Sequence, residues 1–481
     1  MLWIAAGALL RLVLIVFQHP GDDDTGVYLE LGHNLLHRGV YGIADGDDLT
    51  PSLFRLPGYP LFLALIELLF ARFWLQAVFA VQAVADVAGG VLLALFARRH
   101  INLRAADCVL ALAMLCPFTA AYAGIGMTEC LTVFAISVGI YAAGRALSAS
   151  ASGSRDRWAL ALAGCAAALA MLLRPDGALL FAALAAGLFG YTLRSQAASQ
   201  GWKRGLRSAV SSAVLFSLVA LLPLVPWTVR NWTDFHLIQP LAPRYVNDPG
   251  ERVNHGFYTW MRTWSVEYVS TGDVFWHVGQ DTIDIDDVPP RAFDSPEQRA
   301  QTGALLDEYN RWKGISPEVD SRFADLAAER ISAHPTRYYL TLPLLRVTDM
   351  LLRPRTEEFC LEIHWWQWRD HPVQTLLAAG LGLINLIYVG LGLWGFARGR
   401  VPWAWMLGGY LVLRFLLLGT MENSEPRYTL ECFPVLIVAA GAALEHFRNT
   451  RSLVGGRERW LLLPPLRRGP VAGDPGQEKA T

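Results

Sequence analysis

The sequence has little charge and few cysteines for its length. Only 17% of its 481 residues are charged, whereas 53% are hydrophobic, and the mean hydropathy is +0.30. A soluble domain of this length would need more charge to cover its surface. Five of the six cysteines fall in apolar runs, and Cys360 alone lies in a segment that we expect outside the membrane. This pattern argues against a disulfide framework.

Several common motifs are also missing. The sequence has no GxxxxGK[ST] phosphate loop, no Rossmann glycine fingerprint after a strand and no HExxH zinc helix, so nucleotide-driven chemistry is not expected. We find no paired Cys/His spacing that indicates a structural zinc site. No basic surface or RNA-binding motif indicates a nucleic-acid partner.

What the sequence does have is apolar runs of roughly 20 residues, the length that crosses a bilayer core as a helix. In lipid the backbone must satisfy its own hydrogen bonds, so we expect helices. The first run contains Arg11 and lacks a signal-peptide cleavage site, so we interpret it as a retained span. We predict an all-α polytopic membrane protein with about ten transmembrane helices plus a mixed or helical extracytoplasmic domain. The expected spans are 1–18, 76–97, 107–123, 127–145, 158–173, 177–193, 209–227, 373–397, 402–419 and 428–447.

The basic residues between these spans predict the orientation. If the spans alternate, all five basic groups fall on one side, which is then the cytoplasm, and both termini face it. These groups include Arg98, Arg99, Arg145, Arg155, Arg157, Lys203, Arg204, Arg207, Arg398 and Arg448. The predicted divisions are a membrane domain 1–229 with an outer loop 19–75, an extracytoplasmic domain 230–372, membrane helices 373–447 and a cytoplasmic tail 448–481.

Within the outer segments, two amphipathic stretches predict helices at Glu297–Trp312 and Val319–Ala333. The apolar stretch Tyr59–Phe73 is short, and we expect it to lie at the interface or to dip into the bilayer. The stretch Tyr338–Leu352 is interrupted by Pro and charged residues, so we expect it to pack at the outer interface without crossing.

Charged groups near the membrane face are costly and suggest function. The run Asp22 to Asp24 could supply a general base or hold a divalent cation, or Asp24 could simply cap a helix. Arg55, beside a rigid Pro turn, suits a phosphate, or it marks a lipid-headgroup boundary. The topology places further charged residues at this same face, namely Glu129, Arg174, Asp176, Arg230 and Arg427. Four arginines with Asp24 and Glu129 would suit an anionic headgroup, although Arg174 and Asp176 could also form a local ion pair.

Several short stretches carry a resemblance. They are DTGVY with LELGHNLLHRGVYG after it, RLPGYP at Arg55–Pro60, MTECL, LLRPDG, PWTVRNW and PRYTLECFP. In this order the sequence resembles the membrane glycosyltransferases with the GT-C fold. The closest groups are the protein O-mannosyltransferases, the lipid A aminoarabinose transferase and the rhizobial lipopolysaccharide sugar transferases.

The resemblance implies a role for each matching residue. Asp24 would be the general base; because Thr25 follows it, the second acid would be Asp23 or be absent. Arg55 would bind the donor phosphate. The helpers at the phosphate would be Arg174, Arg230 and Arg427, and the other candidate substrate contacts are Tyr28, Tyr59, Glu129, Asp176 and Tyr428. Four aromatic residues of the outer domain could stack on sugar faces: Trp260, Trp264, Trp276 and Trp312.

The implied activity is a hexosyl or pentosyl transfer from a polyprenyl-phosphate-linked sugar to a lipid, glycan or protein acceptor. The implied setting is the inner (plasma) membrane of a bacterium, with the site on the extracytoplasmic face. No cofactor is certain, and a divalent metal stays open. The alternatives are a transporter or flippase of lipid-linked saccharides, a polysaccharide polymerase or ligase, and an inactive scaffold with the same fold.

Overall fold

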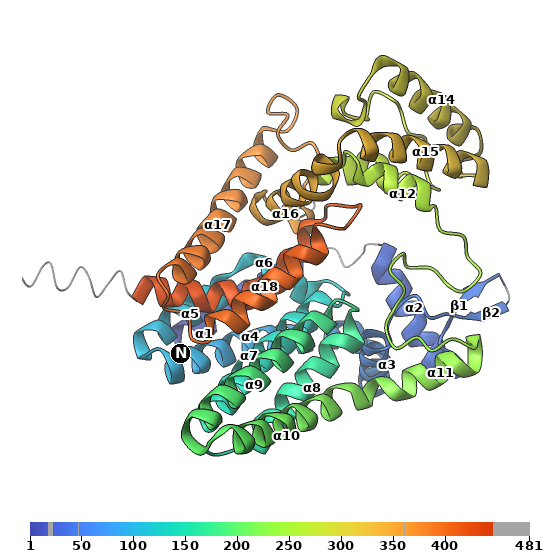
Figure 1. Ribbon diagram of the computed structural model, residues 1–481. Helices are drawn as coiled ribbons and strands as arrows, with labels where there is room; N and C mark the ends of the chain where they lie inside the picture. Colours follow the sequence, from blue (N-terminus) through green and yellow to red (C-terminus); the bar gives the residue numbers. More distant parts are fainter. Residues whose placement is uncertain (18–22, 47, 360, 446–481) are drawn as a thin grey trace, which may run out of the picture.

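The computed structural model describes residues 1–17, 23–46, 48–359 and 361–445, and it is built almost entirely from helices (Figure 1). The first elements are α1 (Leu2–Phe17), α2 (Asp23–Arg38), β1 (Gly42–Asp45), β2 (Asp48–Pro51), α3 (Gly58–Phe70), α4 (Trp74–His100), α5 (Leu103–Leu115), α6 (Pro117–Ala121), α7 (Glu129–Ala151), α8 (Arg157–Leu173), α9 (Gly177–Gln200), α10 (Trp202–Leu221) and α11 (Val225–Phe235). Then follow α12 (His255–Arg262), α13 (Tyr268–Ser270), α14 (Pro296–Trp312), α15 (Pro317–Ala333), α16 (Leu342–Leu352), α17 (Pro372–Ala397), α18 (Ala404–Leu418) and the 3₁₀ segment η8 (Pro426–Cys432), with helix continuing to residue 445.

Among the described residues, six helical segments are long and apolar enough to cross a membrane, or seven if the bent pair α5–α6 is one span. They are Gly58–His100, Glu129–Ala151, Gly177–Gln200, Trp202–Phe235, Pro372–Ala397 and Pro426–Glu445. The shorter apolar helices α1, α8 and α18 coincide with three further expected spans. The chain is therefore a multi-pass helical membrane protein, whereas the count of ten spans and the orientation stay predictions. The predicted cytoplasmic tail, 448–481, lies entirely outside the described residues.

The bend between α5 and α6 explains the arginine in the first apolar run. Pro117 has no N–H, so the carbonyl of Ala113 loses its usual helical partner. Arg11 supplies donors instead, with Nη2 3.2 Å from the Ala113 oxygen and Nη1 2.8 Å from the Met114 oxygen. Its charge is paired with Asp86 of α4 at 2.5 Å. Arg11 thus holds α1, α4 and the end of α5 together inside the apolar core.

The loop that we predict to lie outside the membrane contains a small hairpin that the sequence analysis did not predict. Strands β1 and β2 are antiparallel, with Gly42 opposite Pro51. Arg230 of α11 fastens the hairpin base, because it donates to the backbone oxygens of Tyr41 and Ser52, each at 2.7 Å. In Figure 1 the hairpin and α2 lie beside α11, which follows from these contacts.

The segment predicted as the extracytoplasmic domain forms helices with their own hydrophobic core. Helices α14 and α15 confirm the two amphipathic predictions, and each begins with a serine cap before a proline at the first helical position. In Figure 1, α12, α14 and α15 lie together, apart from α7 to α10. Trp260 and Trp264 are almost fully buried in this core, so they do not offer the sugar-stacking surface that we predicted. Trp276 and Trp312 are exposed.

The sequence analysis placed two apolar stretches at the membrane interface rather than across the bilayer. The predicted interfacial helix Tyr59–Phe73 is α3, which continues through a short turn into α4 as one apolar segment. The stretch Tyr338–Leu352 becomes a π turn followed by α16, and among the described residues it is not one of the candidate spans.

Candidate active site

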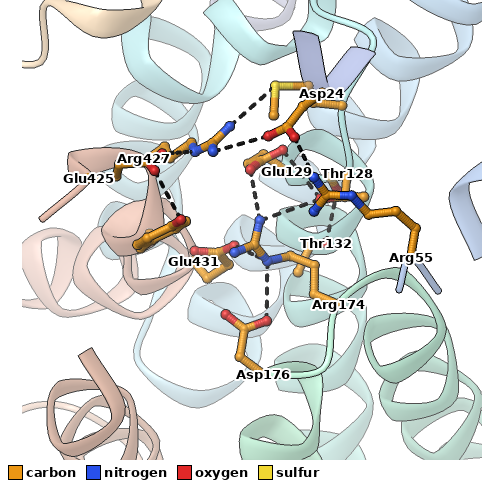
Figure 2. A network of polar contacts seen from close by, with 12 residues as sticks. Asp24, Arg55, Thr128, Glu129, Thr132, Arg174, Asp176, Glu425, Arg427 and Glu431 are labelled. Carbon is orange, nitrogen blue, oxygen red and sulfur yellow. Dashed lines mark hydrogen bonds and ion pairs between the residues drawn. The ribbon is translucent and has the colours of Figure 1, made fainter. Parts of the chain in front are cut away.

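Asp24 lies in the first turn of α2, where two arginines hold its carboxylate (Figure 2). Arg55, three residues before α3, donates to one oxygen, and Arg427 of η8 donates to the other at 3.1 Å. Arg427 is also paired with Glu425. We call these four residues the Asp24 cluster. Helix α2 begins at Asp23, so Asp24 already lies inside the helix. Its side chain pairs with arginines rather than capping the helix, which was the alternative interpretation.

A second group of charges lies next to the first and deeper in the helices. Arg174 pairs with Glu129 at 2.7 Å and with Asp176 and Glu431 at 3.2 Å each. Arg414 of α18 pairs with the same Glu431 at 2.9 Å and with Asp176 at 3.2 Å. We call these five residues the Arg174 cluster. Its members come from four separate places in the chain, so it ties α7, the α8–α9 turn, α18 and η8 to one another.

The two clusters contain four arginines and five carboxylates, whereas the sequence analysis placed four arginines and two acids at this face. A phosphate could bind only where an arginine has donors to spare. Arg55 has one, since its Nε is buried and has no hydrogen-bond partner among the described residues. The Tyr28 ring supports this guanidinium at 5.3 Å.

The arginines set the ionisation of one aspartate in each cluster, Asp24 and Asp176. Burial alone would raise the pKa of Asp24, but the charges of Arg55 and Arg427 outweigh it and hold the pKa below its ordinary value. Burial likewise opposes ionisation of Asp176, and the charges of Arg174 and Arg414 lower its pKa nonetheless. Both groups are therefore carboxylates at neutral pH.

Asp24 stands at the border of two cavities. The first, of about 420 Å³, has walls that include Leu173, Leu179, Leu417 and Leu418, and we call it the apolar-walled cavity. The second, of about 410 Å³, is lined by polar and aromatic residues, and we call it the outer cavity; its lining includes Tyr268, Trp276, Gln280, Glu357 and Glu425. Asp24, Met127 and Arg427 line both cavities. A carboxylate in this position reaches molecules on either side.

Most of the residues singled out from the sequence meet at the apolar-walled cavity. Its lining includes Asp24, Tyr28, Arg55, Glu129, Arg174, Asp176, Arg427 and Tyr428. Two do not reach it: Tyr59 is fully buried and donates to Gln82 at 2.7 Å, and Arg230 fastens the hairpin. Asp22 and the side chain of Asp23 lie outside the described residues.

The sequence analysis assigned no role to three residues of this region. Arg244 lines the apolar-walled cavity and donates to the Thr420 carbonyl oxygen at 2.6 Å, and no sequence signal pointed to it. Arg414 is the one charged residue in the apolar helix α18. Because burying a charge in an apolar helix costs free energy, its position could have marked it as a functional candidate. Glu431 falls within the quoted stretch PRYTLECFP, but only the packed structure shows that it meets Arg414 and Arg174.

The described residues that come together as candidate metal ligands lie elsewhere, at His33, His37 and Glu67. In the Asp24 cluster, arginines take both oxygens of the carboxylate, so it is not arranged as a ligand. The histidine pair is visible in the sequence as HNLLH, a spacing that the sequence analysis did not single out.

Comparison with known proteins gave structural matches only. No family model and no curated protein sequence matches this chain. The structure is similar to the archaeal oligosaccharyltransferase AglB of Archaeoglobus fulgidus in complex with an inhibitory peptide and a dolichol-phosphate, with a TM-score of 0.49 and 13% identity. It is also similar to ArnT from Cupriavidus metallidurans bound to undecaprenyl phosphate, with a TM-score of 0.38 and 15% identity over 92% of this chain and 77% of that one. The AglB match covers 98% of this chain and 52% of the other, so this chain spans about half the length of that transferase.

Proposed function

We propose that this chain is a membrane glycosyltransferase that takes a sugar from a polyprenyl-phosphate-linked donor and passes it to an acceptor. One observation carries the proposal: Asp24 lies between two arginines at the border of an apolar-walled cavity and a polar cavity. This arrangement suits a reaction in which a lipid-borne donor and a polar acceptor meet at one carboxylate. The sequence stretches around Asp24, Arg55 and Arg427 favour the same function.

On the donor side, the phosphate would bind Arg55 through its unused Nε, with Arg427 and Arg244 nearby on the same lining. A guanidinium is suited to this because its fixed fork of donors matches phosphate oxygens. The leucine walls would hold the first part of the lipid chain. The acceptor would enter through the outer cavity, whose Trp276 is exposed and able to stack on a sugar face.

In the reaction, the acceptor hydroxyl oxygen forms a bond to the anomeric carbon. The bond between that carbon and the phosphate oxygen breaks, and the phosphate leaves with the electron pair. Asp24 takes the hydroxyl proton, as a general base within hydrogen-bond reach. Arg55 stabilises the charge that develops on the leaving phosphate. When the phosphate draws Arg55 away, the pKa of Asp24 rises from its lowered value, so donor binding makes the carboxylate a stronger base.

The test is release of polyprenyl phosphate from a panel of undecaprenyl- and dolichol-phosphate-linked sugars, using membranes that contain wild type, Asp24→Asn or Asp325→Asn. Asp325 is an exposed residue of α15 and serves as the matched control. We expect release with at least one donor in wild type and the control, and none in Asp24→Asn. Equal release in all three contradicts the role of Asp24. Movement of the intact lipid-linked sugar across the membrane without release favours a transporter instead.

A further inference from the structure

Two histidines and a glutamate come together at the other end of α2 from Asp24. His33 and His37 are four residues apart on α2, and Glu67 faces them from α3. His33 Nδ1 lies 3.2 Å from Glu67 Oε1, and His37 Nε2 lies 2.9 Å from the same oxygen. The three atoms all lie within 4.8 Å of one another. None of the three residues lines either cavity of the candidate active site.

We propose that His33, His37 and Glu67 form a binding site for a divalent transition metal ion, with Zn²⁺ as the ion that the ligand set fits best. Histidines at this spacing lie on one face of a helix and commonly bind one ion together. Zinc bonds of about 2.0–2.2 Å in a tetrahedron place ligand atoms about 3.3 Å apart, close to the two distances observed here. The imidazoles are 59% and 51% exposed, so an ion and a water in the fourth position can reach them.

The surroundings of Glu67 provide an independent reason for a cation. Helix α3 is apolar along its length, GYPLFLALIELLF, and Glu67 is its only charged residue. The exposed leucines Leu61, Leu65 and Leu68 indicate that part of α3 faces lipid. A carboxylate in such a helix is costly unless a positive charge compensates it. A bound divalent ion would coordinate this carboxylate and compensate its charge.

The residue directly after the first histidine indicates a structural role for the metal. In an HExxH zinc helix, the residue after the first histidine is a glutamate that acts as general base. Here it is Asn34, which donates to the Gly42 carbonyl oxygen at 3.0 Å. The site thus lacks that base and instead joins α2 to α3. Asp24 lies near the start of α2, and Arg55 lies just before α3. A metal that joins α2 to α3 would therefore also help to fix the Asp24–Arg55 pair.

The experiment uses the full-length protein, purified in detergent, stripped with a chelator and titrated with Zn²⁺ and with Co²⁺ as a visible-absorption probe. We expect one ion per chain, a visible tetrahedral Co²⁺ spectrum and a higher melting temperature with stoichiometric Zn²⁺. The double variant His33→Ala/His37→Ala should bind Zn²⁺ at least about 100-fold more weakly, since loss of direct ligands exceeds the 10–100-fold effect of losing a supporting contact. His334→Ala, an exposed histidine after α15, should bind as wild type does.

A second variant separates ligand loss from misfolding. Glu67→Gln keeps the side-chain volume and removes the uncompensated charge, so it should melt no lower than metal-free wild type while losing most of the Zn²⁺-induced increase. The proposal fails if wild type neither binds nor is stabilised by stoichiometric Zn²⁺, or if the double variant and Glu67→Gln keep wild-type affinity. These measurements contain no transfer assay, so their outcome is independent of the proposed enzymatic function.

Discussion

Members of the Asp24 cluster and of the Arg174 cluster line the same cavity, yet the two clusters differ in how deeply their charged side chains are buried. In the Arg174 cluster, two arginines share three carboxylates, and Glu129, Glu431 and Arg414 are almost fully buried. In the Asp24 cluster, Asp24 and Arg55 are 27% and 20% exposed. The same chemical groups thus provide a fixed support in one cluster and an available reaction centre in the other.

The largest effect that separates the clusters should come from Asp24. We expect Asp24→Asn to lower kcat about 10³-fold, within the usual contribution of a general base. The free energy of unfolding should fall by less than about 1 kcal/mol, because partly exposed ion pairs contribute little to stability. Single-turnover transfer and thermal unfolding in detergent measure the two quantities. A large loss of stability instead would make Asp24 a structural residue.

Glu431 should show the opposite response. Glu431→Gln removes a carboxylate that pairs with both Arg174 and Arg414, and breaking these two buried ion pairs costs about 3 kcal/mol of the free energy of unfolding. The matched control is Glu308→Gln, whose partner Arg322 forms an exposed ion pair at 2.9 Å on α14 and α15, and it should cost under about 1 kcal/mol. Thermal unfolding of both variants checks this. Equal losses would remove the distinction between a buried support and a surface pair.

A smaller effect concerns donor binding. Arg55→Lys keeps the charge but loses the fork of donors, so we expect the donor KM to rise about tenfold, equivalent to about 1.4 kcal/mol. Arg230→Lys is the control, because Arg230 holds backbone oxygens of the hairpin and not the cavity. It should lower the melting temperature and leave KM near the wild-type value. If both variants raise KM alike, the cavity is not where the phosphate binds.

The smallest effect is a pH-dependent change in stability at Asp349, a carboxylate whose arginine partner is relatively far away. Burial raises the pKa of Asp349 to about 6, and Arg353 is 3.6 Å away. A raised folded-state pKa gives stability that is present below the ordinary carboxyl pKa and is lost as the pH rises through about 6. Asp349→Asn should therefore stabilise the protein by roughly 2 kcal/mol at pH 8 and change little at pH 4. Asp24, whose pKa is lowered, should show no such gain in Asp24→Asn. Unfolding curves at both pH values decide.

The sequence predicted those features that depend on hydropathy and order along the chain. The helices predicted at Glu297–Trp312 and Val319–Ala333 were readable because an amphipathic pattern is local. The alternation of spans alone predicted that Asp24, Arg55, Arg174 and Arg427 share one face, and all four line one cavity. Whether a charge would be spare or paired was not readable. Arg230 looked equivalent to the others, and only packing against the hairpin, 178 residues away for Ser52, sets it apart.

The outer segment shows the same limit for aromatic residues. Trp260 and Trp276 lie close together in the sequence and have the same chemistry, yet one is buried in the core of α12 to α15 and the other lines the outer cavity. Composition identifies a large ring that can stack on a sugar, but burial decides whether it is available. Burial depends on which helices pack together, and no local pattern in a single sequence reports that.

The contacts of Arg11 also impose an order on assembly. The carbonyl oxygen of Met114 that Arg11 binds lies 103 residues later in the chain, and its ionic partner Asp86 lies 75 residues later. At a synthesis rate of about 5–20 residues per second, the first helix waits about 5–20 s before all of these groups exist. During that time its guanidinium has to stay hydrated near the membrane surface. Helix α1 is therefore made well before the groups that hold it and reaches its final depth only after them.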